Sequence, residues 1–338
     1  MRVLFIGGTG FISAAVSRLA VARGIELWHL NRGRRGTAID GVRTVVADAH
    51  DPRAVEQALG RERFDAVVDW IAFVPDDVER DIALYGPRTK QFVFISSASA
   101  YEKPPRSPFI TESTPLRNPY WQYSRDKIAC EDRLVRAYRE TGFPVTIIRP
   151  SLTYDTVLPI AIGGWGCATL LDRLKSGRPI VVHGDGTSLW TVTHADDFAK
   201  GFVPLLGHPQ AIGESFHITS DQVLTWNQLY DTIADALGVE ARAVHVPSDF
   251  VARVDPETGA GLLGDKAHSA VFDNSKIRRY VPDYVANIPF HEGIRRTIAW
   301  FEGDPKRWVV RPEVHDVMDR IVAAWSRAGA QRQGEHRP

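Results

Sequence analysis

The chain has 338 residues, 44% of them hydrophobic, and carries 41 basic and 41 acidic side chains. This length allows two lobes or one large domain, and the zero net charge argues against a general affinity for nucleic acid or anionic membranes. Two cysteines without a CxxC pair exclude a disulfide framework and favour a reducing cytoplasm. No apolar run of 18 residues and no signal peptide are recognisable, so no membrane partner is expected.

Short apolar, β-branched runs alternate with helical patterns over the first 150 residues. The expected strands are 2–6, 25–30, 42–47, 64–70, 91–96 and 144–149. Helical patterns between them include 11–23, 51–59 and 121–140. This alternation predicts an α/β fold with a Rossmann-type doubly wound parallel sheet.

The pattern is less regular after residue 150. The segment 158–166, "LPIAIGGWG", looks like a loop over a site. Further expected elements are a strand near 213–220, a helix at 225–237, a strand at 242–247 and helices at 291–302 and 313–326. We therefore expect a dinucleotide-binding domain of residues 1–155 that also takes the returning strand 213–220. A smaller C-terminal substrate-binding lobe would follow (156–212 and 221–326), with a disordered tail at 327–338.

A glycine-rich turn, "FIGGTGFIS" at residues 5–13, lies between the first strand and the first helix. Glycines allow a tight turn and a close backbone approach to a pyrophosphate, and the helix N-terminus attracts its charge. Ser13 stands where a GxxGxxG pattern has its third glycine, and its small side chain should still allow the helix to pack on the strand. The alternative is a glycine-rich turn that holds no ligand.

The end of the second strand bears on the choice of cofactor. It carries Asn31, Arg32, Arg34 and Arg35 and no acidic residue. Guanidinium groups match a 2′-phosphate, so NADP is favoured over NAD, with a solvated basic loop as the alternative. Asp48, at the end of the third strand, is placed either to reach the adenine amino group or to cap the next helix.

A Tyr and a Lys four positions apart, Tyr123 and Lys127, follow the fifth strand. Residues at this spacing share one face of a helix. The fifth strand ends in "FISSASAY", which places Ser96, Ser97 and Ser99 at the carboxyl edge of the sheet, where ligands bind in open α/β sheets. The alternative for the Tyr/Lys pair is two solvated helix residues.

Together the segments "GGTGFIS", "FISSASAY", "YSRDKIACE" and "RPSLTYD" have the order and spacing of a known family. Over residues 1–303 the chain resembles the extended or atypical branch of the short-chain dehydrogenase/reductase superfamily, the NAD-dependent epimerase/dehydratase family. The resemblance implies that Tyr123 is the general acid/base and that Lys127 lowers its pKa and binds the nicotinamide ribose. Ser97 would hold the same substrate oxygen.

The resemblance also implies two binding sets. The expected cofactor-binding residues are Gly7, Gly8, Thr9, Gly10, Phe11, Ile12, Asn31, Arg32, Arg35, Asp48, Ala49, Ile71, Ala72, Tyr123, Lys127 and Pro150. The expected substrate-binding residues are Ser99, Tyr154, Trp165 and Trp190. Because the fourth strand ends in "DWIAF", Asp69, Trp70 and Phe73 would line the cofactor edge.

The chain departs from the family pattern at two informative positions. Ala98 and Ser99 follow Ser97 where sugar 4,6-dehydratases carry an Asp–Glu pair, which argues against that reaction. Trp190 occupies the position of an Arg that grips the substrate diphosphate, and Trp either stacks on a sugar or packs in the core. Arg149 or Arg278 could replace the missing cation.

The expected function is that of an NAD(P)-dependent oxidoreductase or epimerase acting on a hydroxyl or ketone of a sugar-like small molecule. One alternative is an NADPH-dependent ketoreductase of a non-sugar metabolite. The other is a nucleic-acid-binding or NADP-sensing protein, because the subgroup also resembles the chloroplast stem-loop RNA-binding proteins. The sequence has no HExxH motif and no paired His/Cys spacing, so no metal site is expected. Relatives usually dimerise through helices flanking the fifth strand, so a homodimer is possible.

Overall fold

The computed structural model describes residues 1–33 and 39–335, with the side chains described up to residue 330. Its centre is a parallel sheet of seven strands in the order β11-β7-β5-β4-β1-β2-β3. These strands are β1 (Arg2–Ile6), β2 (Glu26–Asn31), β3 (Arg43–Val46), β4 (Ala66–Asp69), β5 (Phe92–Ile95), β7 (Val145–Arg149) and β11 (Ser215–His217). The order reverses between β1 and β4, which confirms the predicted doubly wound sheet.

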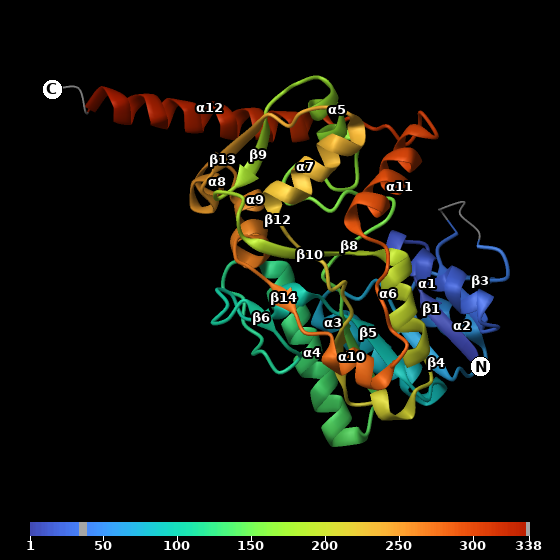
Figure 1. Cartoon of the computed structure of the whole chain (residues 1–338). Helices are drawn as coiled ribbons and strands as arrows, with labels where there is room; N and C mark the ends of the chain where they lie inside the picture. The colour runs from blue at the N-terminus through green and yellow to red at the C-terminus, as the bar shows by residue number, and fades with distance from the viewer. Residues whose placement is uncertain (34–38, 336–338) are drawn as a thin grey trace.

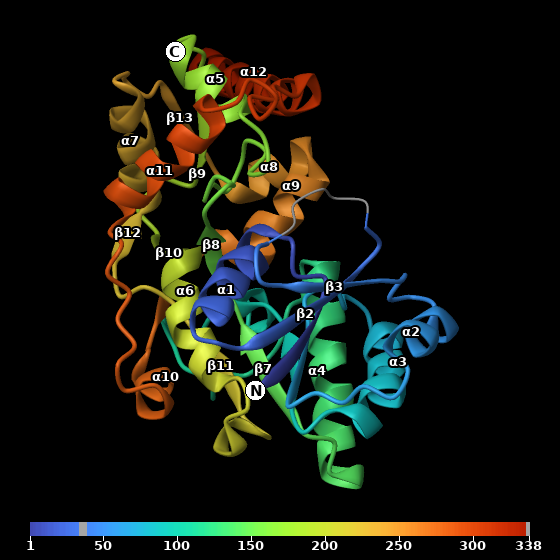
Figure 2. The ribbon, with the colours of Figure 1, turned by 90° about the vertical axis from the view of Figure 1, so that its right-hand side faces the viewer.

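Helices cover both faces of this sheet (Figure 2). On one face lie α1 (Phe11–Ala22) and α6 (Ala195–Phe202); on the other lie α2 (Pro52–Leu59), α3 (Pro75–Tyr85) and α4 (Gln122–Thr141). Each face has its own apolar cluster. The inner strands are therefore buried on both sides, which is why they read in the sequence as nearly continuous apolar runs.

Local signals set several helix ends. Asp51 accepts hydrogen bonds from the N–H groups of Arg53 (3.0 Å) and Ala54 (3.2 Å) and so caps α2. The sequence offered Asp48 as the possible cap of this helix, but Asp51 has that role. Helix α4 ends at Gly142, whose φ of +73° is a left-handed cap.

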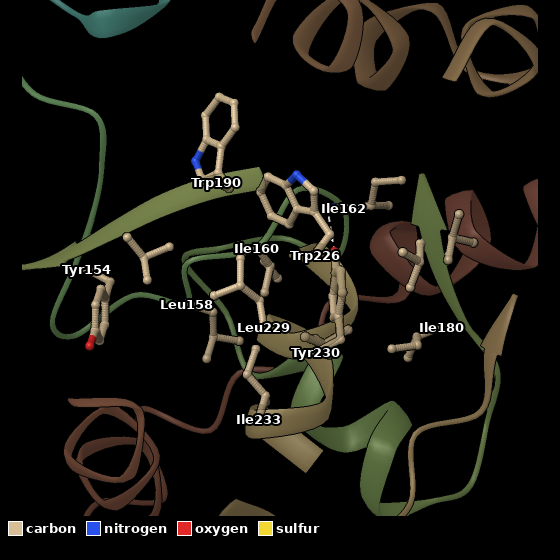
Figure 3. Close-up of a cluster of buried hydrophobic side chains, with 14 of the residues drawn as sticks. Tyr154, Leu158, Ile160, Ile162, Ile180, Trp190, Trp226, Leu229, Tyr230 and Ile233 are labelled. Atoms are coloured by element: carbon tan, nitrogen blue, oxygen red, sulfur yellow. Dashed lines mark hydrogen bonds between the residues drawn. The ribbon is translucent and has the colours of Figure 1, made fainter. Parts of the chain in front are cut away.

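A second part of the chain packs above the carboxyl edge of the sheet (Figure 1). Its small sheets pair β8 (Leu152–Tyr154), β10 (Leu189–His194) and β12 (Val223–Thr225), then β9 (Ile180–His183) with β13 (Ala243–Val246), and β6 (Phe109–Ile110) with β14 (Val271–Phe272). Helix α10 (Ser275–Tyr280), by contrast, packs beside β11, and its buried Ile277 belongs to the apolar cluster of the α1/α6 face. The helices of the second part are α5 (Thr169–Lys175), α7 (Trp226–Leu237), α8 (Ser248–Val254), α9 (Pro256–Gly261), α11 (Phe290–Glu302) and α12 (Pro312–Glu335). A third apolar cluster joins most of them (Figure 3).

Two expectations for this part need comment. The disordered tail predicted from residue 327 is wrong as far as Glu335, because α12 continues to that residue and projects beyond the neighbouring elements (Figure 1). Its buried residues Met318 and Ile321 fix the first turns, and helix extension then costs little per residue. The segment 158–166 has no regular structure, as expected, but Leu158 and Ile160 are buried in the third cluster.

The division of the chain into a dinucleotide-binding and a substrate-binding part remains a prediction. Among the described residues, no helix combines the length and apolar character needed to cross a bilayer.

Candidate active site

The glycine turn is shaped for a ligand that approaches its backbone closely. Gly7 and Gly8 have φ values of +97° and +90°, which only glycine adopts easily. A Cβ at Gly8 would lie 2.7 Å from Nε2 of His29, so this position has no room for a side chain. Helix α1 begins directly after Gly10. The turn and the helix N-terminus together fit a pyrophosphate.

Serines support this turn from below. The Ser13 hydroxyl accepts a hydrogen bond from the Gly10 N–H (2.9 Å), and the Ser17 hydroxyl lies 2.9 Å from Nε2 of His29. Burial lowers the pKa of His29 to about 4, so its ring is neutral. Ser13 thus occupies the third glycine position of the motif without opening a gap, as the sequence predicted.

Polar groups at the ends of β2 and β3 are held by local turns. The Asn31 side-chain oxygen accepts from the Gly33 N–H (2.9 Å), and Asp48 accepts from the His50 N–H (3.1 Å). Arg32 is exposed beside Asn31. Arg34 and Arg35, on which the NADP prediction also rests, lie outside the described residues.

The predicted catalytic side chains converge at the start of α4. The Lys127 ammonium lies 5.9 Å from the centroid of the Tyr123 ring. It donates hydrogen bonds to the carbonyl oxygens of Ala72 (2.6 Å) and Ile95 (2.8 Å), which follow β4 and end β5. Phe73 closes the other side, with its ring centroid 4.6 Å from the ammonium.

The pKa values of Tyr123 and Lys127 differ in one respect from what the family resemblance implies. Burial raises the pKa of Tyr123 to about 12, and the polar Ser97 side chain opposes that shift. Lys127 was expected to lower the Tyr123 pKa, but its ammonium is turned to two backbone carbonyls, and burial lowers its own pKa to about 8. As the structure stands, the phenol keeps its proton at neutral pH.

Behind Lys127 lies a pair of buried acids, Asp69 and Asp81, of which the sequence reasoning named only Asp69. The Asp69 carboxylate accepts hydrogen bonds from the N–H groups of Ile71 (2.5 Å) and Ala72 (2.7 Å), so it fixes the turn whose carbonyl holds the lysine. Burial and the neighbouring Asp69 raise the pKa of Asp81 well above its usual range. Asp69 had been expected to line the cofactor edge; it supports that edge from within.

A buried ion pair lies under the serines of β5. Arg149 donates to Glu131 through Nε (2.9 Å) and Nη2 (2.5 Å), and the Ser96 hydroxyl donates to the same carboxylate. Glu131 follows Lys127 by four positions on the buried face of α4, a spacing that could have flagged it. Arg149 is thus committed to Glu131, and Arg278 pairs with Asp221, so neither is a free replacement for the missing diphosphate-binding Arg.

The four predicted substrate residues have different surroundings. The Ser99 hydroxyl lies within hydrogen-bonding distance of Ser97 (2.9 Å) and accepts from Ser124 (2.8 Å), so it orients Ser97. Tyr154 and Trp190 are only 1% exposed and belong to the third cluster (Figure 3), which is core packing for both. Trp165 is 53% exposed and meets the Phe11 ring edge-on, beside the glycine turn.

Cys130 is a packed thiol, as expected. It is fully buried on α4, and burial raises its pKa to about 12. A thiol that keeps its proton is a poor nucleophile.

The sequence of residues 3–219 matches the model of the NAD dependent epimerase/dehydratase family. The chain belongs to this family. Membership confirms the resemblance found in the sequence and the class of NAD-dependent enzyme predicted from it.

Two curated relatives illustrate the range of similar proteins. The chain is 27% identical over 287 residues to a 2′-dehydrokanamycin reductase of Streptomyces kanamyceticus, covering 84% of this chain and 80% of the relative. It is 28% identical over 265 residues to the chloroplast stem-loop binding protein of 41 kDa b of Arabidopsis thaliana, covering 74% and 67%.

Solved structures share the fold. The UDP-Glc/GlcNAc 4-epimerase of Campylobacter jejuni superposes with a TM-score of 0.71 at 19% identity, covering 90% of this chain and 99% of that one. A dTDP-glucose 4,6-dehydratase of Bacillus anthracis in complex with NAD gives 0.70 at 17% identity, covering 91% and 98%. At these identities the likeness establishes the Rossmann-type architecture alone.

Proposed function

We propose that this family member is an NAD(P)-dependent oxidoreductase or epimerase that acts on a hydroxyl or ketone of a sugar-like molecule. The observation that carries the proposal is the convergence of Tyr123, Lys127 and Ser97 at the sheet edge that also carries the glycine turn. Ile71 links the two regions, because a Cβ at Gly7 would lie 3.1 Å from its side chain.

In this proposal each side chain has one task. Ser97 hydrogen-bonds the substrate oxygen, and Tyr123 gives a proton to that oxygen or takes one from it. Lys127, whose ammonium is held by the carbonyls of Ala72 and Ile95, binds the ribose of the nicotinamide. The nicotinamide, when bound, supplies or accepts the hydride.

The raised pKa of Tyr123 favours one direction of reaction. A phenol with a pKa of about 12 is a proton donor at neutral pH, which suits reduction of a ketone to an alcohol. The similarity to a 2′-dehydrokanamycin reductase supports the same direction. NADP remains the favoured cofactor because Arg32, Arg34 and Arg35 follow Asn31 without an acidic residue.

The test begins with the cofactor. Nucleotide released from denatured protein is identified, and nucleotide-free protein is titrated with NADPH and NADH. Tightly held NAD favours epimerisation, whereas an empty site that prefers NADPH favours reduction. Failure to bind either nucleotide contradicts the proposal.

Turnover of a panel of keto sugars is then followed by the nicotinamide absorbance. Tyr123→Phe should lower kcat by about 10²- to 10⁴-fold, the usual contribution of a positioned acid. The matched control is Tyr120→Phe, which removes an exposed hydroxyl three residues away and should leave kcat unchanged. Full activity of Tyr123→Phe would remove the phenol from the mechanism.

A nucleic-acid-binding role is the second candidate, because the chain resembles a stem-loop binding protein over 74% of its length. Phosphate contacts would give a steep salt dependence of affinity. Filter binding of a stem-loop RNA at two salt concentrations should detect no such binding.

A further inference from the structure

A second buried lysine lies outside the Tyr123 group. Lys103 is 2% exposed, and its ammonium is 5.9 Å from the centroid of the Trp190 ring. Its counter-charge is the Asp265 carboxylate, at 4.0 Å, which is too long for a hydrogen bond. Within residues 1–33 and 39–335 no acceptor completes a hydrogen bond to this ammonium. An ammonium has three donors, so an acceptor supplied by a ligand can complete its hydrogen bonds.

The surroundings of Lys103 carry an excess of positive charge. Asp265 already pairs with Lys266, whose ammonium lies 2.9 Å from its other oxygen. One carboxylate therefore serves two lysines. The nearby His268 adds no negative charge, and its pKa is lowered by burial and by Lys103. Glu102, the acid adjacent in sequence, pairs with Arg106 at 3.0 Å.

The group of Lys103, Asp265 and Lys266 is linked to the Tyr123 phenol through the Trp121 ring. The Lys266 ammonium is 5.6 Å from the ring centroid of Trp121, and that ring packs 4.9 Å from the Tyr123 ring. The Asp265 charge acts on Tyr123 by raising its pKa. Asn118 ties the two sides together, because its amide donates to the carbonyls of Ser99 (2.9 Å) and Gly264 (2.6 Å).

The backbone that carries Asp265 and Lys266 is unusual. Residues Leu262–Lys266 form one π-helical turn, a geometry often found at functional sites. The turn packs closely against Trp121, since a Cβ at Gly264 would lie 2.6 Å from the Trp121 Cβ. In Figure 3 the Trp190 indole, against which Lys103 lies, is on the other side of β10 from Leu158 and Ile233.

We propose that Lys103 and Lys266 form a subsite for an anionic group, a carboxylate or a phosphoryl group, of the substrate that reacts at Tyr123. The proposal rests on the proposed function and narrows its substrate class to acidic sugar derivatives. It also accounts for the loss of the diphosphate-binding Arg to Trp190, because the cations come from two other segments of the chain.

The test measures binding of three probes to the full-length Tyr123→Phe variant by calorimetry, with and without NADP⁺. Glucuronate and glucose 6-phosphate should bind about 10- to 100-fold more tightly than glucose, as expected for charge-assisted hydrogen bonds. Lys103→Met should abolish this preference. Lys175→Met, which removes a lysine that pairs with Glu302 on the surface, is the control and should retain it.

Asp265→Asn separates a ligand subsite from a purely structural ion pair. If the carboxylate competes with the ligand, its removal should strengthen anion binding; if the ion pair only holds the fold, removal should weaken or leave it unchanged. The order of glucuronate and glucose 6-phosphate tells a carboxylate from a phosphoryl site.

Equal affinity for the three probes, or a preference that survives Lys103→Met, overturns the subsite. If Lys103→Met does not fold, Lys266→Met and Asp265→Asn decide in its place. Loss of nucleotide binding or full turnover by Tyr123→Phe would instead refute the proposed function, whatever the probes show.

Discussion

At Gly8 the backbone conformation and the surrounding space both exclude a side chain. The φ is +90°, and the ring of His29, held by Ser17, occupies the place of a Cβ. The sequence identified this residue because glycine spacing after a strand is a local signal. It could not show that His29 is the neighbour, since that contact crosses from β2 to the turn after β1.

Gly8→Ala should therefore destabilise the fold and weaken dinucleotide binding. The left-handed φ and the contact with His29 should cost about 1–3 kcal/mol of unfolding free energy. Gly24→Ala is the control: its φ is +75°, but nothing lies within 4 Å of the added Cβ. It should cost about 1 kcal/mol and leave nucleotide affinity unchanged. Denaturant unfolding measures the stability of the two variants, and NADPH titration measures their nucleotide affinity. Equal NADPH affinities of Gly8→Ala and Gly24→Ala would contradict a role of Gly8 in dinucleotide binding.

Lys127 also illustrates what residue-level reasoning can and cannot reach. The Tyr/Lys spacing located the pair, whereas the lowered Lys127 pKa depends on burial by β4, β5 and α4 together. Asp81 and Lys103 escaped notice for the same reason, because burial of a charged side chain is a property of the assembled fold.

The Lys127 pKa of about 8, below its ordinary value, makes the stability of the ligand-free protein depend on pH. The unfolded chain binds more protons than the folded one between pH 8 and 10.5, so this contribution to the unfolding free energy rises with pH across that window. The rise should be about 3 kcal/mol. In Lys127→Met it should vanish, while Lys90→Met, at an exposed lysine, should follow the wild type. If the unfolding free energies of Lys127→Met and wild type change in parallel with pH, burial does not lower the Lys127 pKa.

At the scale of elements, the ion pair between Arg149 and Glu131 joins the end of β7 to α4, and the Ser96 hydroxyl connects it to the end of β5. Strand β5 then continues into Ser97. The proposed catalytic serine and the helix of Tyr123 are thus positioned by one buried charged group.

Glu131→Gln should cost about 3–5 kcal/mol of unfolding free energy, because it leaves the Arg149 guanidinium buried without a counter-charge. Adding Arg149→Met should recover much of that loss. The partly exposed pair of Lys175 and Glu302 supplies the control, where Glu302→Gln should cost at most about 1 kcal/mol. Chemical denaturation checks all three, and a loss below about 1 kcal/mol for Glu131→Gln would show that water reaches the pair.

Elements were predictable where their signal is local. The strands of the first 150 residues are buried on both faces and stand out as apolar runs. Strands β9 and β10 were missed because they pair with β13 and with β8 and β12, segments that no local pattern connects to them. Helix α6 carries Asp196 and Asp197 in its first turn, a local signal that favours a helix N-terminus there.

For the whole molecule, the returning strand at 213–220 was foreseen, and β11 pairs there with β7 in parallel. The placement of the second part of the chain over the sheet edge was not deducible, since it depends on contacts between distant segments. The Lys103 group shows this most clearly: its charges come from residues 103, 265 and 266, which meet only when both parts are folded.

The position of β11 at the sheet edge has a consequence for synthesis on the ribosome. Residues 155–212 must emerge before Ser215–His217 can cover the free edge of β7. Until then the nascent chain exposes an unpaired apolar strand, the kind of edge to which other chains add. A pause in translation after β7 would prolong that exposure, so the risk of aggregation during synthesis is highest between the appearance of β7 and that of β11.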